Sequence, residues 1–118
     1  MLNIIPRPVH AVLDYGYAIK ALAAPWLFGF ADEPAAKVAS EVAGAVTLVS
    51  TLATRHEGGV VKMLPFNTHL KMDAIHAVVT AASPWVFGFA HNTRARNVFL
   101  GLALLEVVVV ALSEPDSE

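Results

Sequence analysis

Apolar residues gather into four long stretches separated by short polar segments. The stretches are approximately Pro8–Phe30, Pro34–Thr54, Thr68–Phe89 and Thr93–Leu112. None of them alternates apolar and polar residues as a half-buried β-strand does. At about 1.5 Å per residue, a helix over each stretch would be roughly 30 Å long, which matches the hydrocarbon core of a bilayer. The pattern predicts an all-α fold, a bundle of four transmembrane helices.

Residues at the ends of these stretches are typical of helix termini. Gly29 and Gly88 stand where the first and third helices should end. We expect N-terminal caps at three places, namely Asp32 with Pro34, Asn67–Thr68 and Asn92–Thr93.

The second half of the chain repeats the first at an offset of 59 residues. Residues 10–31 and 69–90 are identical at ten of 22 positions, among them Pro25/Pro84, Trp26/Trp85 and Gly29/Gly88. This density predicts a tandem duplication within one membrane domain, residues 1–118. Repeat 1 covers about 6–54, repeat 2 about 65–113, and a short acidic tail follows at 114–118. Because each repeat has two helices, both would enter from the same side, as a parallel repeat related by an axis along the membrane normal.

The paired motifs APWLFGF and SPWVFGF, each near the end of the first helix of a two-helix unit, resemble the SPW repeat family of small bacterial membrane proteins. The resemblance covers nearly the whole chain, although Ala24 stands where the second motif has Ser83. It implies four membrane helices in two tandem hairpins, in the bacterial inner membrane. It implies no activity, because the family has no biochemical role to carry over.

Composition favours a membrane over a soluble bundle. The 118 residues are 56% hydrophobic and 15% charged, whereas soluble domains are roughly 25% charged. The stretch Leu100–Leu112 holds one charge, Glu106, so a helix there lacks the polar face of a soluble amphipathic helix. The strongest predicted span is Ala74–Thr93, which has no Asp, Glu, Lys or Arg. The expected partner is therefore the lipid bilayer. The formal net charge of −2 excludes a basic surface for nucleic acid.

Charges and aromatic residues bear on how the helices would sit in the bilayer. The face with both termini and the central connection carries four cations, and the other face carries three. The positive-inside rule therefore places the termini in the cytoplasm, by one charge. Trp26 and Trp85 are expected to anchor the helices at the interface and to pack around the bends made by Pro25 and Pro84.

Histidine and aspartate recur four residues apart near the start of the first and third helices. His10 and Asp14 share one face of the first helix, and His69 and Asp73 share one face of the third. The parallel repeat puts both pairs at the same depth, where the third and fourth helices add two more polar side chains. We predict one polar cluster formed by His10, Asp14, His69, Asp73, His76 and Glu106.

Two interpretations of this cluster stay open. Acidic side chains within a span cost about 2.5–3.5 kcal/mol on insertion scales, so they are usually buried and partnered. In the structural interpretation, which we favour, each Asp bonds the His of its own helix and the start of the other repeat. In the functional one, the cluster holds a divalent metal or relays protons. Haem ligation by both histidines is disfavoured because each has an acid at i+4 and lies near the interface.

Two further patterns concern packing. Lys20 and Glu41 would face each other across the first hairpin, and both are replaced by apolar residues in repeat 2, so we predict an ion pair inside the membrane. The small residues Ala36, Ser40 and Gly44 recur every four positions, which favours close helix contact within the chain or between copies of it.

The chain has no cysteine, no phosphate-binding Gly loop and no HExxH motif, so we expect no enzyme and no cofactor. The leading hypothesis is a structural or accessory membrane protein. The alternative is a small transporter, or a metal- or proton-binding membrane protein, that uses the His/Asp/Glu cluster. Whether the chain forms a homo-oligomer or joins a larger membrane complex stays open.

Overall fold

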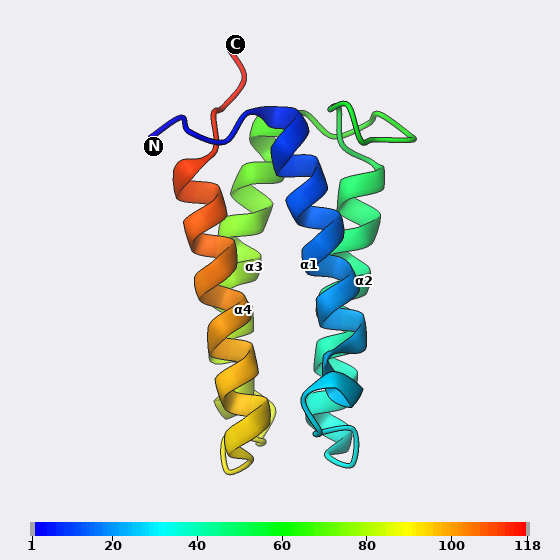
Figure 1. Cartoon of the computed structure of the whole chain (residues 1–118), viewed down its shortest axis with the longest axis vertical. Coiled ribbons are helices and arrows are strands. Elements are labelled where there is room, and N and C mark those ends of the chain that lie inside the picture. The colour runs from blue at the N-terminus through cyan, green and yellow to red at the C-terminus, as the bar shows by residue number, and fades with distance from the viewer. Residues whose placement is uncertain (1, 118) are drawn as a thin grey trace.

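Four long helices carry most of the chain in this computed structural model, which describes residues 2–117 (Figure 1). They are α1 (Arg7–Leu27), α2 (Pro34–Leu52), α3 (Phe66–Val86) and α4 (Thr93–Leu112). Among the described residues there is no β-strand, only two isolated bridges. The prediction of an all-α fold with four helices is confirmed.

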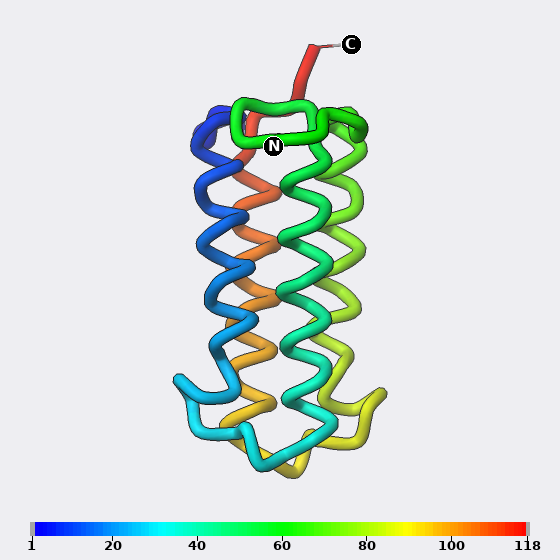
Figure 2. Tube along the Cα trace, turned by 90° about the vertical axis from the view of Figure 1, so that its right-hand side faces the viewer, coloured from blue at the N-terminus to red at the C-terminus, as the bar shows by residue number. Residues whose placement is uncertain are grey.

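The helices form two hairpins that stand side by side. Helix α1 packs chiefly on α2 and α3 chiefly on α4, whereas the α1–α4 and α2–α3 contacts between hairpins are much smaller. Both chain ends and the connection between α2 and α3 lie at one end of the bundle, and the two hairpin turns lie at the other (Figures 1 and 2). This is the arrangement that a parallel repeat predicts.

The repeated Pro-Trp motif ends α1 and α3 three residues earlier than the apolar pattern predicted. Gly29 and Gly88 have φ of 73° and 75°, a conformation that glycine adopts without strain. The chain then turns back on the helix, so that Phe30 N–H donates to Pro25 O and Phe89 N–H donates to Pro84 O, both at 2.8 Å. The motif is thus a helix C-cap of the Schellman type, with a fully buried phenylalanine after the glycine.

The same turn corrects the strongest predicted span. Residues 74–93 are not one helix, because they contain the end of α3, the turn at Gly88 and the first residue of α4. The apolar run therefore continued through a turn, where Phe87 and Gly88 are exposed and Phe89 is buried.

Only one of the three predicted N-terminal caps is confirmed. The Asn92 side chain accepts from Ala95 N–H at the start of α4. Helix α2 instead begins at Pro34 after Glu33, and α3 begins at Phe66 after Pro65, neither with a side-chain cap. At α3 the Pro65 carbonyl already accepts from His69 N–H, so proline sets the helix start ahead of the expected Asn67–Thr68 cap.

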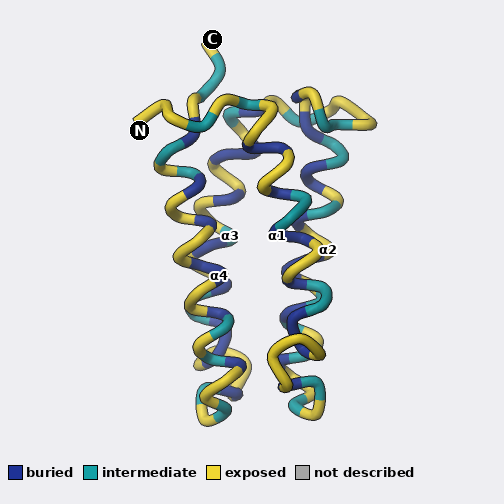
Figure 3. The backbone as a smooth tube through the Cα atoms, viewed as in Figure 1, coloured by how far each residue is buried: buried dark blue, intermediate teal, exposed yellow. Residues whose placement is uncertain are grey.

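Side chains are distributed so that the polar ones lie inside and large apolar ones outside. Buried positions run along the inner side of each helix, and exposed positions along the outer side (Figure 3). Apart from phenylalanines and a few other large side chains such as Leu70 and Leu102, the interior is built from alanine and from polar residues such as His10. Exposed large apolar residues occur on every helix, for example Ile19, Val49, Val78 and Leu104.

Helices α2 and α4 are long and apolar enough to cross a membrane, with mean hydropathies of 1.3 and 2.0. Helices α1 and α3 do not reach this level, because their inner faces carry the His and Asp residues that the sequence placed in a cluster.

The small residues of α2 face α1 within the hairpin. Ala36, Ser40 and Gly44 are buried, and the Ser40 hydroxyl donates to Ala21 O at 2.6 Å. A Cβ atom at Gly44 would lie 2.9 Å from Ala18 O, so only glycine allows the two backbones to approach this closely. The close contact is therefore internal to the chain.

We predict that Gly44→Ala destabilises the protein by about 1–3 kcal/mol, because the added methyl group forces the two backbones of the first hairpin apart. Gly101→Ala is the matched control, since a Cβ atom there meets nothing within 4 Å, and it should be neutral or gain up to about 1 kcal/mol of helix propensity. Unfolding of detergent-solubilised protein, followed by circular dichroism, measures both. Equal stability of the two variants would contradict the close contact.

Candidate functional site

The segment before each odd helix is held against the end of an even helix by backbone hydrogen bonds. Ile5 N–H donates to Leu112 O, and Leu64 N–H, at the equivalent place in repeat 2, donates to Ala53 O. The start of α1 is thereby fixed beside the end of α4, and the start of α3 beside the end of α2. Side chains near these four helix ends meet inside the bundle, toward the end that holds both termini (Figure 1).

Four of the predicted site residues form a closed ring of hydrogen-bonding atoms at this place. His10 Nε2 lies 3.0 Å from Asp14 Oδ2 and 3.1 Å from Asp73 Oδ2. His69 Nε2 lies 2.6 Å from Asp14 Oδ2 and 3.1 Å from Asp73 Oδ2. All four residues are buried, and the two histidines are fully so. We call His10, Asp14, His69 and Asp73 the quartet; each carboxylate contacts the histidine of its own repeat and that of the other.

Two hydroxyl groups that the sequence analysis did not single out complete the surroundings of the histidines. Ser113 Oγ lies 2.7 Å from His10 Nδ1, and Thr54 Oγ1 lies 2.7 Å from His69 Nδ1. Thr54 and Ser113 are separated by the repeat offset of 59 residues. A search for identical residues misses them because one is threonine and the other serine, whereas a search for shared hydroxyl chemistry finds them.

The hydroxyl groups determine which ring nitrogen carries a proton. Thr54 Oγ1 donates to Ser50 O and Ser113 Oγ donates to Val109 O, each four residues back in its helix. A hydroxyl group has only one proton to donate. Each therefore accepts from the imidazole Nδ1–H, so that Nε2 of both histidines is the atom turned toward the carboxylates.

His76 and Glu106 do not join the quartet but form a separate pair. His76 Nδ1 lies 2.8 Å from Glu106 Oε1, across the α3–α4 hairpin. Tyr17 packs against the His76 ring, and its buried hydroxyl has no hydrogen-bond partner among residues 2–117. The predicted cluster of six residues is thus divided into a quartet between the hairpins and a pair within the second hairpin.

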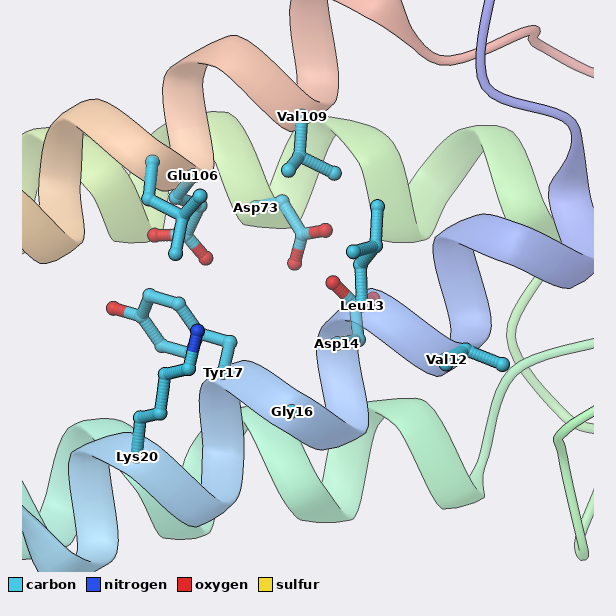
Figure 4. Close-up of a pocket in the computed structure, with 10 residues that line it drawn as sticks. Val12, Leu13, Asp14, Gly16, Tyr17, Lys20, Asp73, Glu106 and Val109 are labelled. Carbon is cyan, nitrogen blue, oxygen red and sulfur yellow. The ribbon is translucent and has the colours of Figure 1, made fainter.

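The expected Lys20–Glu41 ion pair is not seen: among the described residues, no salt bridge joins the two. Lys20 instead lines a cavity between α1 and α4 (Figure 4). The reason is helical geometry, since Lys20 lies three residues after Tyr17 and so shares the face turned toward α4.

This cavity has a volume of about 270 Å³ and reaches the quartet from the side. The carboxylates of Asp14 and Asp73 point into it, and Tyr17 and Glu106 line it on the same side as Lys20 (Figure 4). Of the four quartet residues, the two aspartates are the ones that line this cavity.

The tryptophans of the repeated motif point outward. Trp26 and Trp85 are both well exposed, and Lys37 Nζ lies 5.3 Å from the centroid of the Trp26 ring. The outward orientation is the one that the anchor hypothesis predicts, and it leaves Pro25 and Pro84 buried beneath the two rings.

The connection between the hairpins adds a fourth histidine and a set of ion pairs. His56 is buried beside the rings of Phe66 and His69, and neither ring nitrogen has a partner in the described part of the chain. Burial lowers the pKa of His56 below its ordinary value of 6.5. Arg7 pairs with Glu57 and with Asp116, and its hydrogen bond lowers the pKa of the Glu57 carboxyl.

The chain was compared with known protein families, curated proteins and solved structures. A family model described as the SPW repeat domain matches residues 8–114, nearly the whole chain. Neither the curated proteins nor the solved structures gave a match. The matched range contains the quartet, both hydroxyl groups and both Pro-Trp motifs.

We predict that Asp73→Asn lowers the unfolding free energy by about 3–5 kcal/mol, because it removes one charge of a buried, mutually paired set. Asp32→Asn, in the exposed turn between α1 and α2, is the control and should change stability by less than about 0.5 kcal/mol. Thermal unfolding in detergent measures both. An Asp73→Asn protein as stable as the control would show that the quartet contributes nothing to folding.

We also predict that stability declines on acidification partly through His56. The unfolded chain binds a proton at this residue near pH 6.5, and the folded chain binds it only at lower pH. The contribution is therefore present above pH 6.5 and is lost as the pH falls through the lowered pKa. In His56→Phe the loss of melting temperature between pH 7.5 and pH 5 should be smaller than in the unmodified protein. An identical loss in both would contradict this assignment.

Proposed function

Since this chain belongs to the SPW repeat domain family, we propose that it is a small integral membrane protein of structural or accessory type in which all four helices cross the bilayer. The proposal includes α1 and α3, whose mean hydropathy is held down by the quartet and by His76 and Lys20. It assigns no catalytic activity to the chain.

The observation that carries the proposal is the exposed apolar flank of all four helices. On α1 and α3, where composition is least apolar, Val12, Ile19, Ile75 and Val78 are each about two-thirds exposed. In water, large apolar side chains exposed in such number on every helix would promote association or aggregation. In lipid it is the expected exterior, and the helices of 19–21 residues match the bilayer core.

The burial of the quartet supports a structural role. Its four residues lie in the interior where the two hairpins meet, and every Nε2 and Oδ2 atom of the ring contacts the other repeat. In a bilayer there is no water to replace these contacts if the hairpins separate. The quartet thus serves as the polar lock that holds one hairpin against the other.

We place the protein in the bacterial inner membrane with both termini in the cytoplasm. Toward the end with the termini, Arg7 and Lys71 lie in the first two turns of α1 and α3, and Arg55 and Lys62 lie in the connection between α2 and α3. Toward the hairpin turns, Lys37 lies in the first turn of α2, and Arg94 and Arg96 lie in the first turn of α4. The balance of four to three favours a cytoplasmic position for the termini.

Cysteine labelling tests this topology, because the natural chain has no cysteine. We expect single variants Val60→Cys and Glu114→Cys to react with a membrane-impermeant maleimide only after cells are permeabilised. Asp32→Cys and His91→Cys, in the two hairpin turns, should react in intact spheroplasts. All four positions are exposed in the structure, so accessibility differs only through the membrane.

The pattern of sidedness separates the outcomes. If Asp32→Cys and Glu114→Cys react from the same side, the proposal that each hairpin crosses the bilayer twice is wrong. If the two sets separate but exchange sides, the four spans stand and the assigned orientation is reversed.

A further inference from the structure

We propose that the quartet is a binding site for one divalent transition-metal ion, with Zn²⁺ as the best-matched ion, held by His10 Nε2, Asp14 Oδ2, His69 Nε2 and Asp73 Oδ2. This goes beyond the structural role proposed above, because it assigns a ligand to the lock. It rests on the placement of these atoms and stands independently of the membrane topology.

Hydroxyl partners orient both histidines of the quartet. The hydroxyl groups of Thr54 and Ser113 donate hydrogen bonds to helix carbonyls, so each accepts a hydrogen bond from an imidazole Nδ1–H. Both imidazoles therefore direct Nε2, the second ring nitrogen, at the same two carboxylate oxygens. A neutral imidazole fixed at Nδ1 and presenting a bare Nε2 is the arrangement in which histidine ligates metals, and the hydroxyl groups act as the outer partners that orient it.

The four nitrogen and oxygen atoms of the quartet enclose a space of the size that a metal ion needs. The four atoms alternate nitrogen and oxygen around a ring with edges of 3.0, 3.1, 3.1 and 2.6 Å, and all lie within 4.8 Å of one another. Whether such a ring is flat or folded toward a tetrahedron, its centre is about 2 Å from each atom, close to the roughly 2.0–2.2 Å of zinc–nitrogen and zinc–oxygen bonds. An ion of this class fits with small side-chain adjustments.

The buried charge of the two aspartates calls for neutralisation. Two aspartates and two neutral histidines carry a formal charge of −2 in a buried position, which is costly in an apolar surrounding unless it is neutralised. Either one divalent cation at the centre or one proton on each Nε2 supplies the missing charge. The two states exclude each other, because the ion and the protons occupy the same place.

The donor set selects among ions. Mg²⁺ and Ca²⁺ prefer six or more oxygen ligands, whereas two imidazoles with two carboxylates in four-coordination suit Zn²⁺ and its neighbours. The cavity beside α1 and α4 gives such an ion a path to the quartet, since Asp14 and Asp73 line it (Figure 4).

Metal analysis of the full-length chain tests the site. Protein purified in detergent without a polyhistidine tag is stripped with a chelator, titrated with ZnCl₂, and its retained zinc is measured by mass spectrometry after desalting. We expect one Zn²⁺ per chain in the unmodified protein and none in the double variant Asp14→Asn/Asp73→Asn. Glu106→Gln, which removes the nearby carboxylate outside the quartet, should still retain one.

Two further measurements cover the case in which the double variant does not fold. Thr54→Val keeps the shape of the side chain but frees His69 to rotate or change its protonated nitrogen, and it should weaken zinc affinity about 10–100-fold. In the unmodified protein, zinc X-ray absorption should show four nitrogen or oxygen ligands with the signature of two imidazoles.

The opposite results overturn the proposal. A stripped, unmodified protein that retains no zinc above the buffer level shows that the quartet is neutralised by protons alone. Zinc retained equally by the unmodified protein and a folded double variant, or absorption spectra without two imidazoles, places the ion elsewhere. In each of these cases the topology and the stabilising role of the quartet remain to be judged by their own tests.

Discussion

The arrangement of the two hairpins depends on satisfying four buried polar side chains that neither hairpin satisfies by itself. His10 takes its hydroxyl partner, Ser113, and one of its carboxylates, Asp73, from repeat 2, and His69 takes Thr54 and Asp14 from repeat 1. Helices of different hairpins make fewer contacts than helices of the same hairpin, and the outer surfaces are apolar. In an apolar environment, where exposed hydrophobic area drives no association, such polar contacts between helices provide the specificity. Because the hairpin is duplicated, each repeat contributes one His/Asp pair and one hydroxyl group to these contacts.

The Pro-Trp motif stabilises one end of the bundle, and the quartet stabilises the other. At the turn end, glycine in a left-handed conformation allows Phe30 and Phe89 to fold back into the interior, where both contact the cluster around Phe99. At the terminal end, backbone pairing brings the end of each even helix beside the start of an odd helix, which delivers the hydroxyl groups to the histidines. Apolar packing thus closes one end, and hydrogen bonding closes the other, with tryptophans exposed near the turns.

Much of this architecture could be predicted from the sequence, because the repeat offset alone relates His10, Asp14 and Gly29 to their counterparts in the second half of the chain. The four apolar stretches predict four helices, and the offset then predicts two equivalent hairpins, the shared face of the termini and the meeting of the two His/Asp pairs. Helix ends were less predictable, since the apolar run Ala74–Thr93 contains a turn whose apolar residues resemble those of the helix before it. The predicted Lys20–Glu41 pair is not seen among the described residues, because Lys20 lines the cavity between α1 and α4. Thr54 and Ser113 were missed because they share a hydroxyl group but are different residue types, so they do not appear among the identical positions of the two repeats.

The most direct test of the account is a double-mutant cycle across the hairpin boundary, with His69→Gln and Asp14→Asn, whose ring and carboxylate atoms approach to 2.6 Å. Unfolding free energies of the unmodified protein, both single variants and the double variant give the coupling between the two side chains. If the quartet locks the hairpins together, the coupling should be about 1–3 kcal/mol. Effects that add to within about 0.5 kcal/mol would show that the two residues do not act on each other, and the lock would be refuted.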